Sequence, residues 1–67
     1  AIQTNEKTSV KIIVDWLYIR KGPGTVYKHI DKALKGEEYF IFEKNGTWGR
    51  IGTNRWISIK GKYVKWV

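Results

Sequence analysis

Hydrophobic and polar positions alternate along much of this chain, a period-two pattern that is typical of half-buried β-strands. The alternation runs through residues 10–14 and resumes, out of phase, over residues 17–19. A slip of one residue exchanges the two faces of a strand, so this change of phase predicts a bend or bulge near Asp15 and Trp16.

Turn signals divide the second half of the chain into further short strands. Asn45-Gly46 is the strongest of these signals, because an Asn-Gly pair readily takes the positive φ of a tight hairpin turn. The expected strands are residues 38–43, 47–51, 56–59 and 63–67. The first of them, EYFIFE, is apolar on both faces, which predicts that both faces are buried or covered.

Residues 25–35 carry the least clear pattern, just after the Gly-Pro-Gly turn at 22–24. Tyr27, Ile30 and Leu34 have helical spacing, but the segment is short and has no helix start signal. We expect a loop with one short irregular strand or turn.

About five short strands, separated by turns roughly every 8–12 residues, predict an all-β fold in the form of a small barrel. Residues 1–9 are mostly polar and are predicted to be a linker or a disordered N-terminal segment. The domain itself is expected to span residues 10–67.

The chain is short for a self-sufficient core, because a domain of this size buries only about 60% of the surface that its unfolded chain exposes. It contains no cysteine, which excludes disulfides and thiolate metal sites. Four tryptophans, four tyrosines and two phenylalanines must therefore supply much of the buried area.

Thirteen Lys and Arg side chains against six Asp and Glu give the chain a net charge of +7. Such a field around so small a domain favours partners with negative charge, such as nucleic acid, an anionic polymer or a membrane surface. Solubility alone is the competing explanation. No apolar run approaches the roughly 20 residues that span a membrane, and we expect a monomer.

The residue types needed for catalysis do not occur in a usable pattern. His29 is the one histidine, and neither a cysteine nor an obvious serine partner accompanies it. The adjacent Glu37 and Glu38 would point to opposite faces of a strand, so they do not form an acid–base pair. We therefore expect no enzymatic activity, no metal and no other cofactor.

The glycine-rich turn at 22–24 does not have the features of a phosphate loop. It lacks the lysine and serine or threonine pair of a P-loop, and no helix follows it. Pro23 also removes a backbone amide that a phosphate cradle would use. A shaped turn explains the glycines better.

Basic side chains beside tryptophans leave binding by stacking open. Trp48 with Arg50, and Arg55 with Trp56, are residue types that stack on bases or sugars and hold anions. Core packing is the alternative for each tryptophan, and we expect Trp56 and Trp66 mainly in the core.

Residues 17–30, LYIRKGPGTVYKHI, resemble the signature of bacterial Src-homology-3 domains, in which Leu-x-Val/Ile-Arg-x-Gly-Pro-Gly-Thr/Ser-x-Tyr follows the first strand. The later segments NGTWGRI, RWIS and YV resemble the family in the same order, although His29, Thr47 and Arg55 depart from its pattern. The resemblance implies a small, partly open Src-homology-3-like barrel of roughly five to seven strands.

The resemblance also implies a role. Bacterial Src-homology-3 domains are non-catalytic modules that target a larger parent, such as a wall hydrolase or a surface protein, to the cell wall. The implied ligand is a peptidoglycan peptide, and an anionic wall polymer is a further partner that the positive charge would suit. The implied location is extracellular or cell-wall-associated, as part of a larger protein.

Chain order in eukaryotic Src-homology-3 domains implies, by analogy, a shallow groove between the Gly-Pro-Gly loop, a tryptophan that opens a central strand and a tyrosine near the closing turn. The predicted ligand-binding residues are Tyr18, Arg20, Tyr27, Trp48 and Tyr63. For Arg20 and Tyr27, holding the loop in shape is the alternative role.

Two other functions stay open at this point. A small basic barrel that binds nucleic acid would use the same charge and aromatic residues, whereas a structural or protein-docking module would need neither. A proline-rich-peptide binder of the eukaryotic kind is disfavoured, because its loop is usually acidic and this loop carries Arg20, Lys21 and Lys28.

Overall fold

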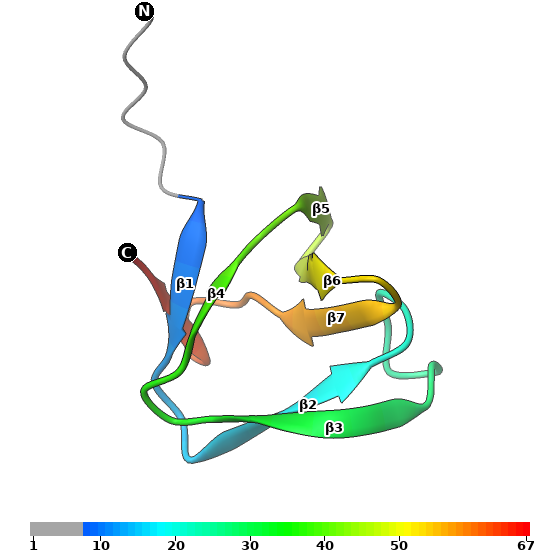
Figure 1. The fold of residues 1–67 in the computed structure, drawn as a ribbon, viewed down its shortest axis with the longest axis horizontal. Coiled ribbons are helices and arrows are strands. Elements are labelled where there is room, and N and C mark those ends of the chain that lie inside the picture. Colours follow the sequence, from blue (N-terminus) through cyan, green and yellow to red (C-terminus); the bar gives the residue numbers. More distant parts are fainter. Residues whose placement is uncertain (1–7) are drawn as a thin grey trace, which may run out of the picture.

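The chain folds into strands and turns. The computed structural model describes residues 8–67, which contain eight strands and no helix (Figure 1). The strands are β1 (Ser9–Ile12), β2 (Trp16–Arg20), β3 (His29–Leu34), β4 (Glu38–Phe40), β5 (Glu43–Asn45), β6 (Trp48–Gly52), β7 (Arg55–Ser58) and β8 (Val64–Trp66). The predicted all-β class is confirmed. Residues 1–7 of the predicted 1–9 linker lie outside the described residues, and Ser9 already belongs to β1.

The strands form two antiparallel sheets. One sheet has the order β4-β1-β8, and the other has the order β3-β2-β7-β6-β5. In Figure 1, β2 and β3 run along the lower edge of the molecule, and β1 and β4 stand at one side. Among the described residues no strand pairing joins one sheet to the other, so the eight strands do not make a closed barrel.

An aliphatic core is built from both sheets. Its buried members are Val10, Ile12, Ile19, Ala33, Ile41, Ile57 and Val64. The expected position of Trp56 is confirmed, because its side chain is buried, and Trp66 is half-buried against the core cluster. Trp16 is 45% exposed and Trp48, like Trp66, is half-buried, so three of the four tryptophans keep some exposed surface.

Residues 38–43 form two strands and not the single strand that was predicted. The Ile41 amide donates to the Thr8 carbonyl (2.7 Å), and the Phe42 amide donates to the Arg50 carbonyl (2.8 Å). The chain therefore leaves the three-stranded sheet at Ile41 and enters the five-stranded sheet at Phe42.

The prediction that both faces of this segment are covered is also wrong. Among the described residues, Phe40 is 48% exposed and Phe42 is 58% exposed. Their rings contact edge to face, with centroids 4.8 Å apart. The apolar outer face of this segment is thus an exposed pair of rings that pack on each other.

Residues 25–35 contain the end of a loop and one short strand with an irregularity, β3, as expected. β3 pairs antiparallel with β2 over its whole length, and Tyr18 lies opposite Lys32. The register shifts at Ile30, because Ile19 pairs with Asp31 and Arg20 pairs with His29. β3 and the division of residues 38–43 between β4 and β5 account for the strand count of eight.

Two predicted turns are present. Gly46-Thr47 connects β5 to β6, one residue later than the predicted Asn45-Gly46 turn. Asn45 ends β5 and pairs with Trp48, and of the two predicted residues only Gly46 has a positive φ (63°). A bend at residues 14–15, between β1 and β2, accounts for the change of phase in the hydrophobic alternation. The bend carries the chain from the three-stranded sheet to the five-stranded sheet.

Candidate functional site

β2 supplies a row of three side chains on one face. Trp16, Tyr18 and Arg20 alternate along the strand and so share that face. Ile19 points into the core, and Leu17 packs partly against it. The Trp16 and Tyr18 rings meet edge to face, with centroids 4.7 Å apart. Burial of the opposite face therefore fixes the aromatic row at the surface.

An open groove of about 290 Å³ lies beside this row. Trp48 reaches it from the start of β6, and Tyr63 reaches it from the turn before β8, where the Tyr63 amide donates to the Lys60 carbonyl (2.9 Å). Ser58, opposite Trp48 in the β6–β7 register, is buried at the groove. The groove is thus walled by aromatic rings from three separate parts of the chain.

Arg20 holds the loop that borders the groove. Its Nη1 atom donates to the Tyr27 carbonyl (2.9 Å) and, at longer range, to the Thr25 carbonyl (3.3 Å). Thr25 lines the groove, as Arg20 itself does. The guanidinium therefore positions one wall of the groove. Holding the loop in shape is the alternative role that the sequence left open for Arg20.

Tyr27 does not line this groove. Its ring packs on the glycines of the turn, and a Cβ atom added to Gly22 would lie 2.5 Å from it. The Tyr27 amide donates to the Gly24 carbonyl (3.3 Å). Tyr27 thus supports the loop and does not line the groove, whereas the other four predicted residues do.

Five residues that line the groove were missed from the sequence, namely Trp16, Leu17, Thr25, Ser58 and Lys60. Trp16 precedes Tyr18 by two positions, so the alternation that selected Tyr18 also selects Trp16. Lys60 lines the groove because the turn from Lys60 to Tyr63 brings it there. No sequence signal marks Lys60, since its position depends on contacts between distant segments.

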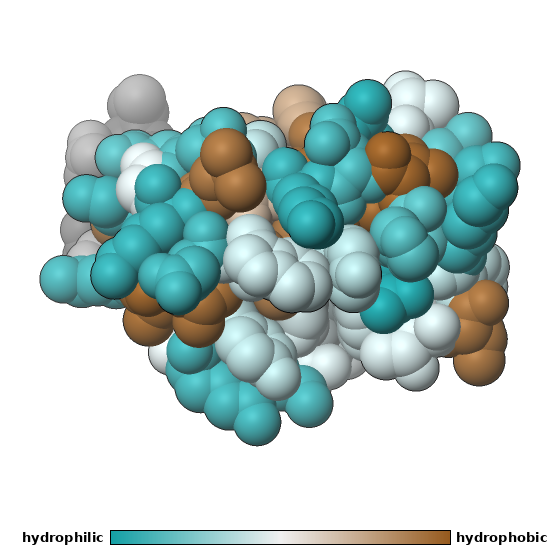
Figure 2. All heavy atoms as spheres, turned by 90° about the horizontal axis from the view of Figure 1, so that it is seen from below, coloured by the Kyte–Doolittle hydropathy of each residue, from teal (hydrophilic) through white to brown (hydrophobic). Residues whose placement is uncertain are grey.

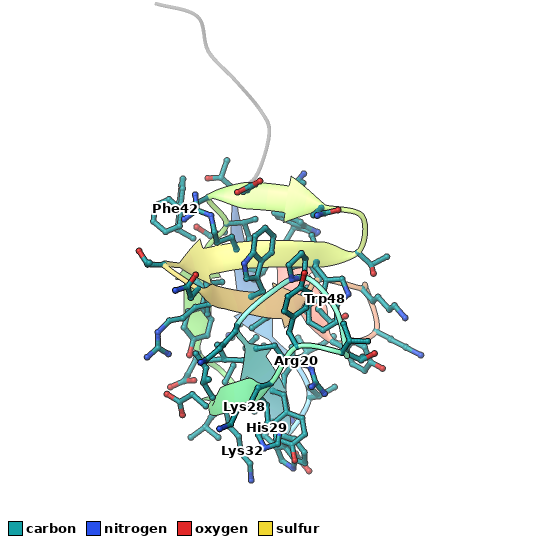
Figure 3. The ribbon with its side chains drawn as sticks, turned by 90° about the vertical axis from the view of Figure 1, so that its right-hand side faces the viewer. Arg20, Lys28, His29, Lys32, Phe42 and Trp48 are labelled. Atoms are coloured by element: carbon teal, nitrogen blue, oxygen red, sulfur yellow. The ribbon has the colours of Figure 1, made fainter. Side chains whose placement is uncertain are left out.

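β3 adds charge and a second ring to the outer face of the β2–β3 hairpin. His29 stacks on Tyr18 with centroids 4.2 Å apart, and the Lys32 Nζ atom lies 4.7 Å from the centre of the Trp16 ring. In Figure 3, Arg20, Lys28, His29 and Lys32 gather below Trp48, and Phe42 lies toward the opposite end. Figure 2, seen from the β2–β3 side, shows side chains of intermediate hydropathy in the middle of this face and hydrophilic ones around them.

Three acidic side chains of the described residues have polar partners within the protein. Glu43 pairs with Arg50 (3.1 Å), and Asp31 pairs with Arg55 (3.6 Å). Glu37 accepts hydrogen bonds from the Leu34 amide (2.6 Å) and the Tyr39 hydroxyl (2.7 Å), and these two bonds lower the pKa of Glu37. Burial, followed by the bond to Glu37, raises the pKa of Tyr39 to about 12.

Within residues 8–67, no three His, Asp or Glu side chains come together in a way that could hold a metal ion. The same part of the chain contains no helix that is long and apolar enough to cross a membrane.

A scan against protein-family models, a search of curated proteins and a search of solved structures each returned no match. The groove is accordingly interpreted from its own geometry.

Proposed function

We propose that this domain is a non-catalytic module of the Src-homology-3 type that binds a cell-wall peptide and thereby holds a larger parent protein at the bacterial wall. The order of elements supports the proposal. A long hairpin with a Gly-Pro-Gly turn precedes Trp48, which opens an inner strand of the five-stranded sheet, and Tyr63 stands just before the last strand. This order is the one that the resemblance of residues 17–30 implies.

The observation that carries the proposal is the meeting of Trp48, Tyr63 and the β2 row around one groove. Aromatic rings suit a short peptide, because they offer broad contact area and lose little conformational entropy on binding. The groove volume of about 290 Å³ is close to the lower end of ligand-pocket volumes, which suits a segment of a few residues.

Lys60 is the residue that would meet a peptide carboxylate in this groove. It lines the groove, and no ion pair joins it to another described residue. Arg20 is already committed to the carbonyls of Thr25 and Tyr27. The charge-assisted contact to ligand therefore falls to Lys60, and Arg20 keeps the loop in place.

Replacing Trp48 tests the proposal directly. Trp48→Ala is expected to weaken cosedimentation with purified peptidoglycan, stripped of anionic polymer, by about tenfold or more, as for other buried aromatic anchors of interfaces. The thermal midpoint should change little, because the ring is half-buried and lies outside the core cluster.

Phe42→Ala is the matched control, because it removes an exposed ring that lies away from the groove. It should leave cosedimentation unchanged. The proposal fails if Trp48→Ala binds like the unmodified chain, or if the two variants lose binding equally. Tight salt-sensitive binding to single-stranded oligonucleotides, with no binding to the stripped wall, would favour nucleic acid instead.

A further inference from the structure

A second hollow lies on the outer face of the β2–β3 hairpin, with the Tyr18 ring between it and the groove. Tyr18 lines both hollows, and the second also takes His29, Ile30, Asp31 and Lys32 in its walls. Its volume is about 450 Å³. The register shift at Ile30 places His29 opposite Arg20 and thereby brings the imidazole onto the face that Tyr18 and Lys32 share.

The rings of this face hold its polar side chains in position. Lys32 lies over Trp16 (4.7 Å), the Arg20 guanidinium lies over Tyr18 (5.3 Å), and His29 stacks on the same tyrosine (4.2 Å). A long side chain that is already held over a ring loses less conformational entropy when an anion binds to it. The cationic side chains of this face are therefore preorganised for binding anionic groups.

Negative charge on the face is largely compensated within the protein. Asp31 is the one carboxylate among the residues that line the second hollow. Its Oδ2 atom lies 3.6 Å from Arg55 Nη1, and its Oδ1 atom accepts a hydrogen bond from the Lys32 amide (2.8 Å). Lys28 and Lys32 have no ion-pair partner among the described residues. The face thus keeps an excess of positive charge.

We propose that this face, made of Lys28, His29 and Lys32 around Tyr18, binds a linear polyanion without aromatic groups, namely a chain of phosphate-linked polyols. Repeated charge is favoured because cations lie on both sides of Tyr18, with Lys60 in the groove and Lys32 at the hollow. Nucleic acid is disfavoured, because its bases need free ring faces for stacking. Here Lys32 covers Trp16, and His29 and Arg20 cover Tyr18.

The face shares Tyr18 with the peptide groove, but its test does not depend on peptide binding. The probe is poly(glycerol phosphate), titrated into the full 67-residue chain by calorimetry and by NMR. His29 is the single histidine, so its ring signals report on the hollow without ambiguity. We expect these signals to shift on binding. Lys28→Gln with Lys32→Gln should weaken binding about fivefold or more and reduce the slope of log K against log salt by about one to two.

Lys11→Gln with Lys65→Gln is the control of equal charge, because these lysines pair across β1 and β8 in the other sheet. It should change affinity less than about twofold. Equal losses in both double variants, or His29 signals that do not move, would overturn the proposal. Tighter binding of an oligodeoxythymidylate of the same charge would assign the face to nucleic acid. Trp48→Ala should keep binding the polymer, so this result stands apart from the peptide test.

Discussion

At the scale of single residues, one contact explains why the turn after β2 carries glycine at position 22. The Tyr27 ring occupies the space that a side chain at Gly22 would need, since a Cβ atom there would lie 2.5 Å from the ring. Arg20 reaches the Tyr27 carbonyl from the other side (2.9 Å). Arg20, Gly22 and Tyr27 therefore stabilise the conformation of the loop through contacts with one another.

Gly22→Ala is expected to destabilise the fold by about 1–3 kcal/mol, because the added methyl group displaces the Tyr27 ring. Denaturant unfolding followed by tryptophan fluorescence measures this change. Gly61→Ala is the control, since a Cβ atom there meets nothing within 4 Å. In a Tyr27→Ala background the cost of Gly22→Ala should largely disappear. An unchanged cost in that background would show that the ring is not the cause.

Sequence alone located four of the nine residues that line the groove, by strand alternation and chain order. Strand alternation determines which side chains of β2 face outward, and it correctly predicted Tyr18 as a groove residue. The same rule selects Trp16, which was not predicted. Trp48 and Tyr63 came from chain order. The position of Tyr27 was not predictable, because a tyrosine five positions after Gly22 can turn either into a groove or onto the glycine.

At the scale of elements, residues 25–35 and residues 38–43 both depend on hydrogen bonds that the local pattern does not reveal. The local pattern of residues 25–35 contains a single buried side chain, Ala33, and the strand is stabilised by its pairing with β2. Residues 38–43 read as one strand, yet the amides of Ile41 and Phe42 bond to different sheets. In both segments the deciding hydrogen bonds join residues that are distant in sequence.

The connection from β3 to β4 makes stability depend on pH at both extremes. Hydrogen bonds from the Leu34 amide and the Tyr39 hydroxyl hold the pKa of Glu37 below its ordinary value of 4.5. The stabilisation is therefore complete above about pH 4.5 and is lost as the pH falls through the lower folded-state value. Burial and the bond to Glu37 raise the pKa of Tyr39 to about 12. The folded chain then keeps a proton that the unfolded chain releases near pH 10, so stability falls between about pH 10 and 12.

Thermal midpoints measured from pH 3 to 12 should thus show a plateau with a decline on each side. Glu37→Gln should flatten the acid decline and bring the ionisation of Tyr39, followed by ultraviolet absorbance, to a lower pH. Glu38→Gln is the matched control, because Glu38 accepts no side-chain hydrogen bond from another described residue. An acid decline that is the same in all three proteins would place its origin in other carboxylates.

At the scale of the whole molecule, positive charge is the property that links stability to binding. The two ion pairs among the described residues both use arginine, with Arg50 and Arg55 as the cations. The lysines between residues 8 and 67 are left without such partners, and Lys11 even lies directly opposite Lys65. Like charges opposite each other in a sheet are destabilising. The unpaired lysines that would attract a polyanion therefore repel one another in the free protein.

The self-repulsion predicts that added salt stabilises the free domain. Between about 0.01 and 0.15 M NaCl the screening length falls from roughly 30 Å to 8 Å, so repulsion between lysines on different strands weakens. Calorimetric scans at pH 7 should show a thermal midpoint that rises over this range. Lys65→Glu removes one of two opposed lysines and lowers the net charge by two, so its midpoint should start higher and rise less. A midpoint that falls with salt would mean that attractive ion pairs outweigh the repulsion, and the surplus charge would then not govern the stability of this fold.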